Sequence, residues 1–283
     1  MSVSRIPDDV GETVARALAE DVGTGDLTAA LIGAAGTAHA HIIAREPGIL
    51  AGTPWGNETF RRVDSGIKAS WRKSDGDPLA ADDILCDING PARGILSAER
   101  TALNFLQTLS GTATEARRYA DAVRGTGATV IDTRKTLPGL RRAQKYAVAV
   151  GGCGNHRMGL YDFILIKENH IAAAGSIEAA LAAARAQRAV VPIEIEVETL
   201  GELEEALAAG AERILLDNFD PTGLREAVRI TAGRAKLEAS GNVEFDAVRA
   251  IAETGVDFIS TGALTKHVRA LDLSLRFVPS PDL

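Results

Sequence analysis

Aromatic residues are scarce in this sequence, at 4% of its 283 positions. A core of any size must therefore be built from Ala, Val, Ile and Leu, as in α/β proteins, and a hydrophobic content of 46% is sufficient for one. Cysteine is also scarce, because Cys86 and Cys153 are the only two in the sequence. Two cysteines exclude a disulfide framework and predict a reducing, cytoplasmic location.

Long apolar runs are missing as well. No stretch of about 18 apolar residues occurs, so no membrane-spanning helix is expected. The N-terminal sequence Met-Ser-Val-Ser-Arg-Ile-Pro-Asp-Asp lacks the apolar segment of a signal peptide. The net charge is −7 and no long basic stripe is present, which argues against nucleic acid as the main partner.

Several common site motifs are also absent. The sequence has no Walker or dinucleotide-binding glycine pattern, and its His and Cys residues lack the spacing of a zinc site. The usual phosphoribosyltransferase motif of two acidic residues after an apolar strand is missing. Cys153 has no evident catalytic partners, so it is not expected to be a nucleophile.

Basic residues gather in one stretch of this acidic chain. Between Asp132 and His170, seven basic and three acidic residues give a local charge of +4, whereas the remainder carries −11. Arg side chains bind carboxylate and phosphate groups through two parallel hydrogen bonds. The stretch therefore predicts a pocket for an anionic small molecule. Its basic residues are Arg134, Lys135, Arg141, Arg142, Lys145, Arg157 and Lys167.

The first part of the chain contains short strands without regular helices between them. Alternating or apolar segments at 37–51 and 67–88 predict strands. Helices are predicted at 8–20, at 97–110 with Ser97 as N-cap and Gly111 as the stop, and at 112–124. The pattern is typical of an α+β domain. We place this domain at residues 1–110, joined by the C-terminal segment 268–283, and a second domain at 111–267.

Strands and helices alternate from residue 128 onward. The last four strand–helix units repeat every ~20–22 residues, which is the length of a minimal βα module, and short loops between them predict a parallel sheet. Six such strands in succession favour an incomplete α/β barrel over an open sheet. Strands are expected at 128–132, 163–167, 193–198, 213–217, 235–240 and 257–261, and helices at 140–150, 176–188, 200–209, 221–231 and 244–254.

Each predicted strand of this second domain ends in a polar residue. The carboxyl ends of parallel strands form the active-site rim of an α/β barrel, so six polar ends predict a charged mouth. The residues concerned are Asp132, Lys167, Glu196 or Glu198, Asp217, Glu238 or Ser240, and Thr261.

Glu194, Glu196 and Glu198 alternate along one predicted strand and therefore share a face. Two interpretations are open. The strand could be an edge strand whose acidic face lies in solvent, or an interior strand whose carboxylates need cations, a metal or substrate hydroxyls nearby. In the second case Glu196 and Asp217 could share Mg²⁺, which prefers carboxylate and water oxygens.

Two glycine turns follow the last two strands. Ser240-Gly-Asn and Thr261-Gly-Ala each precede a helix, where main-chain N–H groups bind phosphate, and barrels often bind phosphate after their final strands. Two ordinary βα turns would have the same composition. A lone histidine in a loop is usually structural, but the position of His156 beside Arg157 in a glycine-rich loop favours a role at an anion.

Eight segments together resemble the quinolinate phosphoribosyltransferase family, the carboxylating nicotinate-nucleotide pyrophosphorylases. The resemblance extends over about residues 8–277 and implies an N-terminal α/β sandwich domain, an incomplete α/β barrel and a homodimer. The segments are Glu20-Asp-Val-Gly-Thr-Gly-Asp-Leu-Thr, Glu99-Arg-Thr-Ala-Leu-Asn-Phe-Leu, Asp132-Thr-Arg-Lys-Thr-Leu-Pro-Gly-Leu-Arg, Asn155-His-Arg, Ile166-Lys-Glu-Asn-His, Glu194-Ile-Glu-Val-Glu, Leu216-Asp-Asn and Glu238-Ala-Ser-Gly-Asn.

This resemblance implies a reaction with Mg²⁺ in which quinolinate and phosphoribosyl pyrophosphate give nicotinate mononucleotide, CO₂ and pyrophosphate. It also implies residue roles. Arg134, His156 and Arg157 would hold the quinolinate carboxylates, and Arg100 would reach in from the neighbouring subunit, although helix spacing alone indicates a solvated charge there. The residues expected to be catalytic are Lys135, Lys167, Glu196 and Asp217, the last two also facing the ribose and the metal.

The remaining substrate contacts implied by the resemblance are at the phosphate side. Ser240, Gly241, Gly262 and Ala263 would take the 5′-phosphate, and Thr133, Asn242 and Thr261 complete the expected binding residues. Thr261 stands where many members have Val or a similar small residue, a conservative change that leaves a main-chain contact possible.

Three alternatives stay open at this level. The chain could be a paralogue of the same fold, associated with molybdate transport, that acts on another anionic substrate. It could also be a non-catalytic barrel that binds phosphosugars, or a nicotinate phosphoribosyltransferase. The intact Arg-Lys and His-Arg pairs oppose the first alternative, and the carboxylates Glu196 and Asp217 oppose the second.

Overall fold

The computed structural model describes residues 5–33, 35–187 and 191–279. These residues form two compact units. The N-terminal unit comprises described residues up to 117 together with 137–152 and 267–279, and the barrel unit comprises 118–136 and the described residues of 153–266. Residues 1–4, residues 280–283 and the predicted helix end at 188 lie outside the described residues. Within the described ranges, no helix combines the length and apolar character that a membrane crossing requires.

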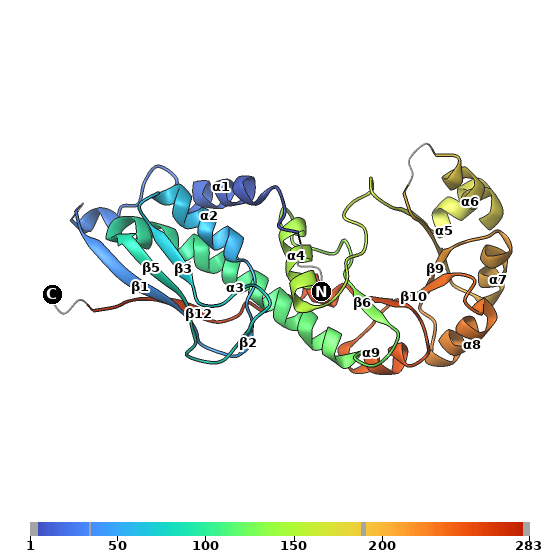
Figure 1. Cartoon of the computed structure of the whole chain (residues 1–283). Helices are drawn as coiled ribbons and strands as arrows, with labels where there is room; N and C mark the ends of the chain where they lie inside the picture. The colour runs from blue at the N-terminus through green and yellow to red at the C-terminus, as the bar shows by residue number, and fades with distance from the viewer. Residues whose placement is uncertain (1–4, 34, 188–190, 280–283) are drawn as a thin grey trace. The chain divides into compact units, whose positions relative to one another are not determined.

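The N-terminal unit is built on an antiparallel sheet with the strand order β12-β1-β5-β3 (Figure 1). Alternation along β1 directs Ala40, Ile42 and Ala44 into one core with Ile95 and Leu106 of helix α3. The strands are β1 (Thr37–Ala44), β3 (Lys68–Trp71), β5 (Ile84–Pro91) and β12 (Leu273–Phe277), with β2 (Gly48–Ile49) and β4 (Pro78–Leu79) pairing separately. The helices are α1 (Val10–Asp21), η1 (Ala29–Leu31), α2 (Thr53–Val63), α3 (Ala92–Ala122) and α4 (Arg141–Gly151).

Helix α3 is continuous over 31 residues, so the prediction of two helices separated at Gly111 was wrong. Gly111 serves close packing instead, because a Cβ atom there would lie 2.1 Å from the main-chain oxygen of Arg269. Ser97 is not an N-cap, since it lies inside α3 and donates a hydrogen bond of 2.7 Å to Asp26 Oδ2. The units divide at Arg117, within this helix, and residues 137–152 with α4 belong to the N-terminal unit.

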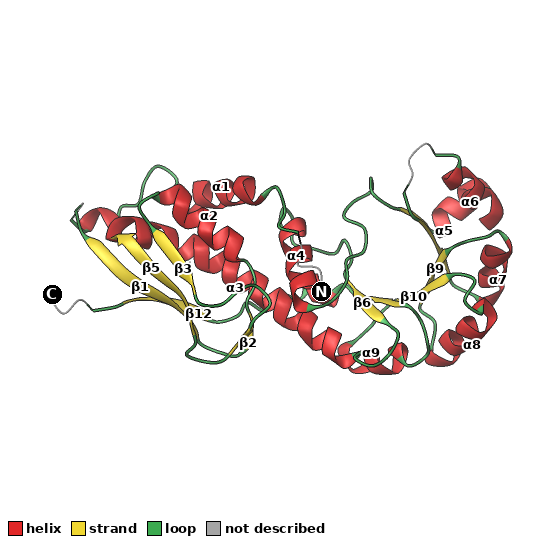
Figure 2. Cartoon of the chain, viewed as in Figure 1, coloured by secondary structure: helices red, strands yellow, loops and turns green. Residues whose placement is uncertain are grey.

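The barrel unit contains a parallel sheet with the strand order β6-β11-β10-β9-β8-β7 (Figure 2), which confirms the predicted α/β fold class. Its edge strands β6 and β7 do not pair with each other in the described part of the chain, so the barrel is incomplete. The strands are β6 (Thr129–Ile131), β7 (Ile164–Ile166), β8 (Ile193–Val197), β9 (Arg213–Asp217), β10 (Lys236–Ser240) and β11 (Phe258–Ser260).

Short helices cover the convex face of this sheet, as Figure 1 shows for α6 to α9. Their buried positions are small or aliphatic, such as Leu203, Leu224 and Val248, in keeping with a sequence poor in aromatic residues. The helices are α5 (Glu168–Ala174), α6 (Ile177–Arg185), α7 (Leu200–Ala208), α8 (Pro221–Thr231), α9 (Phe245–Ala252) and α10 (Ala263–Lys266).

Candidate active site

The polar residues predicted at strand ends stand at one edge of the barrel sheet, because all its strands are parallel. Asp132, Lys167 and Thr261 directly follow β6, β7 and β11, while Asp217 and Ser240 are the last residues of β9 and β10. Glu196 is the next-to-last residue of β8. The carboxyl edge of the sheet therefore carries the charged mouth that the sequence predicts.

Strand β8 lies between β7 and β9, so the interpretation of the acidic strand as a solvent-facing edge was wrong. The side chain of Glu194 is fully buried and that of Glu196 is 10% exposed, whereas Glu198 follows the strand and is exposed. Glu196 Oε2 accepts a hydrogen bond of 2.6 Å from Lys167 Nζ. Two of the three carboxylates thus point into the barrel, and one has a cationic partner at the rim.

Arg157 lies in an environment that suits an anion. Burial and the nearby charge of Arg134 lower the pKa of Arg157, while Asp162, Glu194 and Glu196 act in the opposite direction. The parallel pairing of Ile131 with Gly154 places the segments that carry Arg134 and Arg157 side by side, in line with the effect of the Arg134 charge on Arg157. An anionic ligand between two guanidinium groups would relieve this repulsion and accept several charge-assisted hydrogen bonds.

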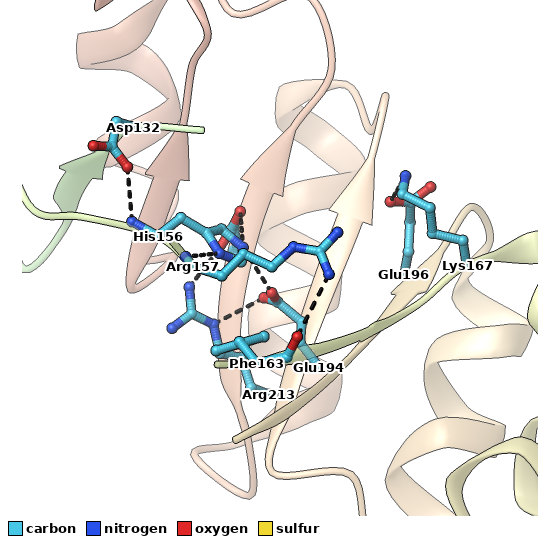
Figure 3. Close-up of polar contacts among 9 residues, drawn as sticks. Asp132, His156, Arg157, Phe163, Lys167, Glu194, Glu196 and Arg213 are labelled. Carbon is cyan, nitrogen blue, oxygen red and sulfur yellow. Dashed lines mark hydrogen bonds and ion pairs between the residues drawn. The ribbon is translucent and has the colours of Figure 1, made fainter. Parts of the chain in front are cut away.

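His156 is held by contacts on both sides of its ring (Figure 3). Its Nδ1 accepts a hydrogen bond of 2.6 Å from the main-chain N–H of Arg157, and its Nε2 lies 3.0 Å from Glu194 Oε2. The proton is therefore on Nε2, which donates to Glu194. The main-chain N–H of His156 donates to the buried carboxylate of Asp132 at 2.9 Å. Both ring nitrogens of His156 therefore already have partners within the protein. The prediction that His156 holds substrate has to be reconciled with these two contacts.

The turns after β9 and β10 are joined to each other. Asn218 N–H donates to the Ser240 main-chain oxygen at 2.9 Å, and the Asn218 side chain donates to Asp217 Oδ2 at 2.7 Å. Gly241 has φ = +95°, and a Cβ atom there would lie 2.2 Å from Asn218 Oδ1. Glycine is therefore required at this position for both its conformation and its close approach. Asn242 follows it and is exposed.

The turn after β11 lies against the segment after β6. Thr261 is buried, and its main-chain N–H donates to the Ile131 oxygen at 3.1 Å. A Cβ atom on Gly262 would lie 2.9 Å from Lys135 Cδ, so Lys135 passes directly over this turn. The Thr133 hydroxyl accepts a hydrogen bond from the Lys135 N–H at 3.1 Å. Lys135 and the start of α10 at Ala263 are thus neighbours at the rim.

Comparison with known protein families gives two matches that together cover most of the chain. The model of the N-terminal domain of quinolinate phosphoribosyl transferase matches residues 26–110, and that of its C-terminal domain matches residues 112–276. The chain belongs to the quinolinate phosphoribosyltransferase family.

Relatives of this quinolinate phosphoribosyltransferase family member are similar over nearly their whole length. The nicotinate-nucleotide pyrophosphorylase [carboxylating] of Mycobacterium leprae is 45% identical over 95% of this chain and 97% of its own. The probable enzyme of that name from Bacillus subtilis is 44% identical over 90% of this chain and 89% of its own. The solved nicotinate-nucleotide pyrophosphorylase of Francisella tularensis has a TM-score of 0.94 at 44% identity, covering 98% of this chain and 99% of that one.

The basic stretch of this family member is divided between the two units. Arg134, Lys135, Arg157 and Lys167 belong to the barrel unit, whereas Arg141, Arg142 and Lys145 lie on α4 in the N-terminal unit. Arg142 is engaged there with Asp8. Arg100 also belongs to the N-terminal unit, where it is exposed on α3. Four of the seven basic residues therefore belong to the barrel unit.

Sequence reasoning missed Arg213, the first residue of β9. Its guanidinium donates to Glu194 Oε1 at 2.8 Å and to Glu238 Oε2 inside the barrel. The period of two along β9 places Arg213 on the same face as Asp217, and this was the available signal. Glu238 was considered as a rim residue, but it is buried below the rim, and Ser240 takes the strand end.

Proposed function

We propose that this protein transfers the phosphoribosyl group of phosphoribosyl pyrophosphate to quinolinate, with decarboxylation, to give nicotinate mononucleotide in de novo NAD synthesis. Membership of the quinolinate phosphoribosyltransferase family supports this reaction. The structural observation that supports it is the parallel pairing of Ile131 with Gly154, which places the segments that carry Arg134 and Arg157 side by side in the barrel unit. Two guanidinium groups on neighbouring segments match a substrate with two neighbouring carboxylates.

Quinolinate binding is assigned to the basic side chains of the barrel unit. Arg134 and Arg157 would each hold a carboxylate through paired hydrogen bonds. Lys135 lies over the Gly262 turn, where it would meet the phosphate groups of the second substrate. Lys167, which is 43% exposed and bound to Glu196, stands between the carboxylate and ribose regions. These four residues orient the pyridine nitrogen towards C1 of the ribose.

The ribose and phosphate ends of phosphoribosyl pyrophosphate are assigned to the carboxyl ends of β8 to β11. Thr133, Ser240, Gly241, Asn242, Thr261, Gly262 and Ala263 supply main-chain and hydroxyl groups for the phosphates, in line with the usual place of phosphate sites in barrels. Glycine at position 241 keeps this turn packed against Asn218 of the neighbouring turn, because a Cβ atom there would clash with Asn218.

Mg²⁺ fits the oxygen donors of Glu196 and Asp217, which come from neighbouring parallel strands on the same inward face. Each carboxylate has one oxygen engaged, with Lys167 or Asn218, and a cation or water would be held by the second oxygen. Two carboxylates suffice because Mg²⁺ retains waters and substrate phosphate oxygens. When bound, Mg²⁺ would offset the charge of the departing pyrophosphate.

The chemistry requires no covalent nucleophile from the protein. The ring nitrogen of quinolinate forms a bond to C1 while the bond from C1 to pyrophosphate breaks, and positive charge builds on the ribose. Glu196 and Asp217 stabilise that charge electrostatically. The alkylated ring then loses its adjacent carboxylate as CO₂, and the electron pair left on the ring carbon takes a proton. The side chains holding that carboxylate contribute mainly orientation and desolvation.

The active form is proposed to be a homodimer in which Arg100 of one subunit completes the quinolinate site of the other. Arg100 is exposed on α3 of the N-terminal unit, which supports a contribution to the site of a partner subunit. Both cysteines are buried and neither forms a disulfide, which supports a location in the reducing cytoplasm.

A substrate panel tests the proposed reaction. The purified protein with Mg²⁺ and phosphoribosyl pyrophosphate is given quinolinate, nicotinate or nicotinamide, and both CO₂ and the nucleotide product are measured. Quinolinate alone is expected to be converted, with one CO₂ released per nucleotide. Conversion of nicotinate without CO₂ would indicate a nicotinate phosphoribosyltransferase instead. Binding of phosphosugar without turnover of any of the three would indicate a non-catalytic barrel.

A further inference from the structure

The interior of the barrel unit contains a layer of charged residues beneath the rim. Arg213 lies at its centre and contacts Glu194 of β8 and Glu238 of β10, both of which have side chains with 0% exposure. The Arg213 guanidinium carbon also lies 4.3 Å from the ring centroid of Phe258 and 5.4 Å from that of Phe163. Layers of apolar side chains usually fill such a barrel, so this layer departs from the common pattern.

This layer of charged residues is not expected to stabilise the fold. Removing two carboxylates and a guanidinium from water has a large cost, and apolar replacements of buried ion pairs are often neutral or stabilising. Glu238 Oε1 is buried and accepts no hydrogen bond from the described residues, although His156 Nε2 lies 3.6 Å away. The arrangement therefore requires an explanation other than the stability of the fold.

A chain of contacts leads from this layer to the candidate substrate site (Figure 3). Arg213 Nε donates to Glu194 Oε1 at 2.8 Å, and Glu194 Oε2 accepts the Nε2–H of His156 at 3.0 Å. The side chain of Glu194 is fully buried, and each of its two oxygens faces one donor, Arg213 Nε or His156 Nε2. Glu194 thus holds both neighbours at once.

The contact with Glu194 determines which nitrogen of His156 carries the proton. With Nε2 protonated, Nδ1 is an acceptor and receives the main-chain N–H of Arg157 at 2.6 Å. A proton on Nδ1 would face that N–H donor and break the contact. The position of the Arg157 backbone, and hence the direction of its guanidinium, therefore depends on the state of His156.

We propose that Glu194 and Arg213 are positioning residues for quinolinate binding, which act through the neutral Nε2–H form of His156 on the main chain of Arg157. The inference rests on the proposed function for its substrate. Neither residue needs to touch quinolinate. Arg213 holds Glu194 in place, Glu194 orients His156, and His156 holds Arg157.

The first test is Glu194→Gln, which has nearly the same shape. Glutamine offers one acceptor oxygen where the carboxylate accepts from both His156 and Arg213, so one buried donor loses its partner. We expect the KM for quinolinate to rise roughly 10- to 100-fold, the loss typical of residues that orient a binding side chain. The KM for phosphoribosyl pyrophosphate should change less than about twofold, because the phosphate contacts lie on other turns. An unchanged KM for quinolinate in folded Glu194→Gln would overturn the proposal.

Two further variants frame this test. Lys236→Gln is the matched control, because Lys236 lies beside Arg213 on β10 but is 66% exposed and pairs with Asp257. It should retain both KM values. Should Glu194→Gln fail to fold, Arg213→Lys is measured by the same criteria, since lysine keeps the charge but cannot bridge both carboxylates. A wild-type KM for quinolinate in Arg213→Lys would also overturn the proposal.

The second test does not depend on activity. Nitrogen-15 NMR of the histidine rings, with His156 assigned through a His156→Asn variant, reports the protonation state of each ring nitrogen. The wild-type protein is expected to show the neutral Nε2–H form near pH 7, and Glu194→Gln should lose that single state. A charged His156 or an Nδ1–H form in the wild type would overturn the proposal. Failure to convert quinolinate would instead refute the proposed function and leave this measurement intact.

Discussion

Lys167 Nζ lies 2.6 Å from Glu196 Oε2 and joins the carboxyl ends of β7 and β8. The contact engages one oxygen of Glu196 at the rim, where the ribose and the metal are assigned. Glu196→Gln would keep the size of the side chain and remove its charge. We expect kcat to fall by roughly 10²–10³, the loss typical of one electrostatic group at a developing charge.

The control for Glu196 is Glu198→Gln. Glu198 is two residues further along the same stretch, but it is exposed and follows the strand. Its substitution should leave kcat near the wild-type value. Steady-state rates at several Mg²⁺ concentrations check both variants. An equal fall in kcat for the two would show that Glu196 has no specific role at the rim.

Arg134→Ala removes one of the two guanidinium groups assigned to quinolinate. Arg134 is exposed at the rim, so its loss should leave the melting temperature nearly unchanged. Turnover should be abolished or nearly so, with kcat/KM for quinolinate at least about 100-fold lower, since a charged partner of the substrate is lost. Arg229→Ala, an exposed residue on α8, is the control. A large drop in melting temperature for Arg134→Ala would indicate a structural role instead.

Arg100→Ala tests the proposed dimer. Alone it should be inactive, but mixing with Arg134→Ala should recover about one quarter of wild-type activity, because half of randomly exchanged dimers contain one intact site. Subunit exchange is verified with differently tagged chains. Recovery should be absent if Arg100 serves the site of its own chain, and that result would contradict the shared site.

Glu238 should make stability depend on pH. Burial and the negative charge of Glu194 raise the pKa of Glu238 from an ordinary 4.5 to about 7. The folded state therefore favours protonated Glu238, and this contribution is complete below pH 4.5 and lost as the pH rises through about 7. Its size is a few kcal/mol at most, since each pKa unit corresponds to about 1.4 kcal/mol.

Glu238→Gln resembles the protonated form and should lack this loss. Urea unfolding between pH 4.5 and 8 gives the free energy of unfolding of each protein. Subtracting the wild-type value from that of the variant removes the opposing pH dependence that Glu194 gives to both. The free energy of unfolding of the variant should rise relative to that of the wild type as the pH increases. A constant difference across this range would show that Glu238 does not titrate there.

Gly111→Ala should destabilise the N-terminal unit. The added Cβ atom would lie 2.1 Å from the Arg269 main-chain oxygen, so one segment has to move. We expect a loss of about 1–3 kcal/mol, as for other overpacked sites. Gly201→Ala in α7 is the matched helical control, because its nearest neighbour would be 3.9 Å away. That variant should be neutral or stabilised by about 0.5–1 kcal/mol, and thermal unfolding distinguishes the two.

The sequence by itself determined the order and type of the barrel strands, although it did not predict α5 or α10. The spacing of apolar residues and the polar strand ends placed Lys167, Asp217 and Thr261 at one rim, because parallel strands all present the same end. Its family motifs likewise predicted the family that the whole-chain comparisons show. These are properties of local pattern, which depend on neighbouring positions along the chain.

Only the tertiary structure decided which charged residues meet. Arg213 and Glu238 are 25 positions apart, and their contact follows from the pairing of β9 with β10. Gly111 stops a helix by local rules, yet a distant main-chain oxygen makes it a packing residue. The basic stretch looked continuous, but α4 carries three of its residues into the other unit. Such contacts depend on strand register and packing between distant segments, which the periodicity of a single chain does not encode.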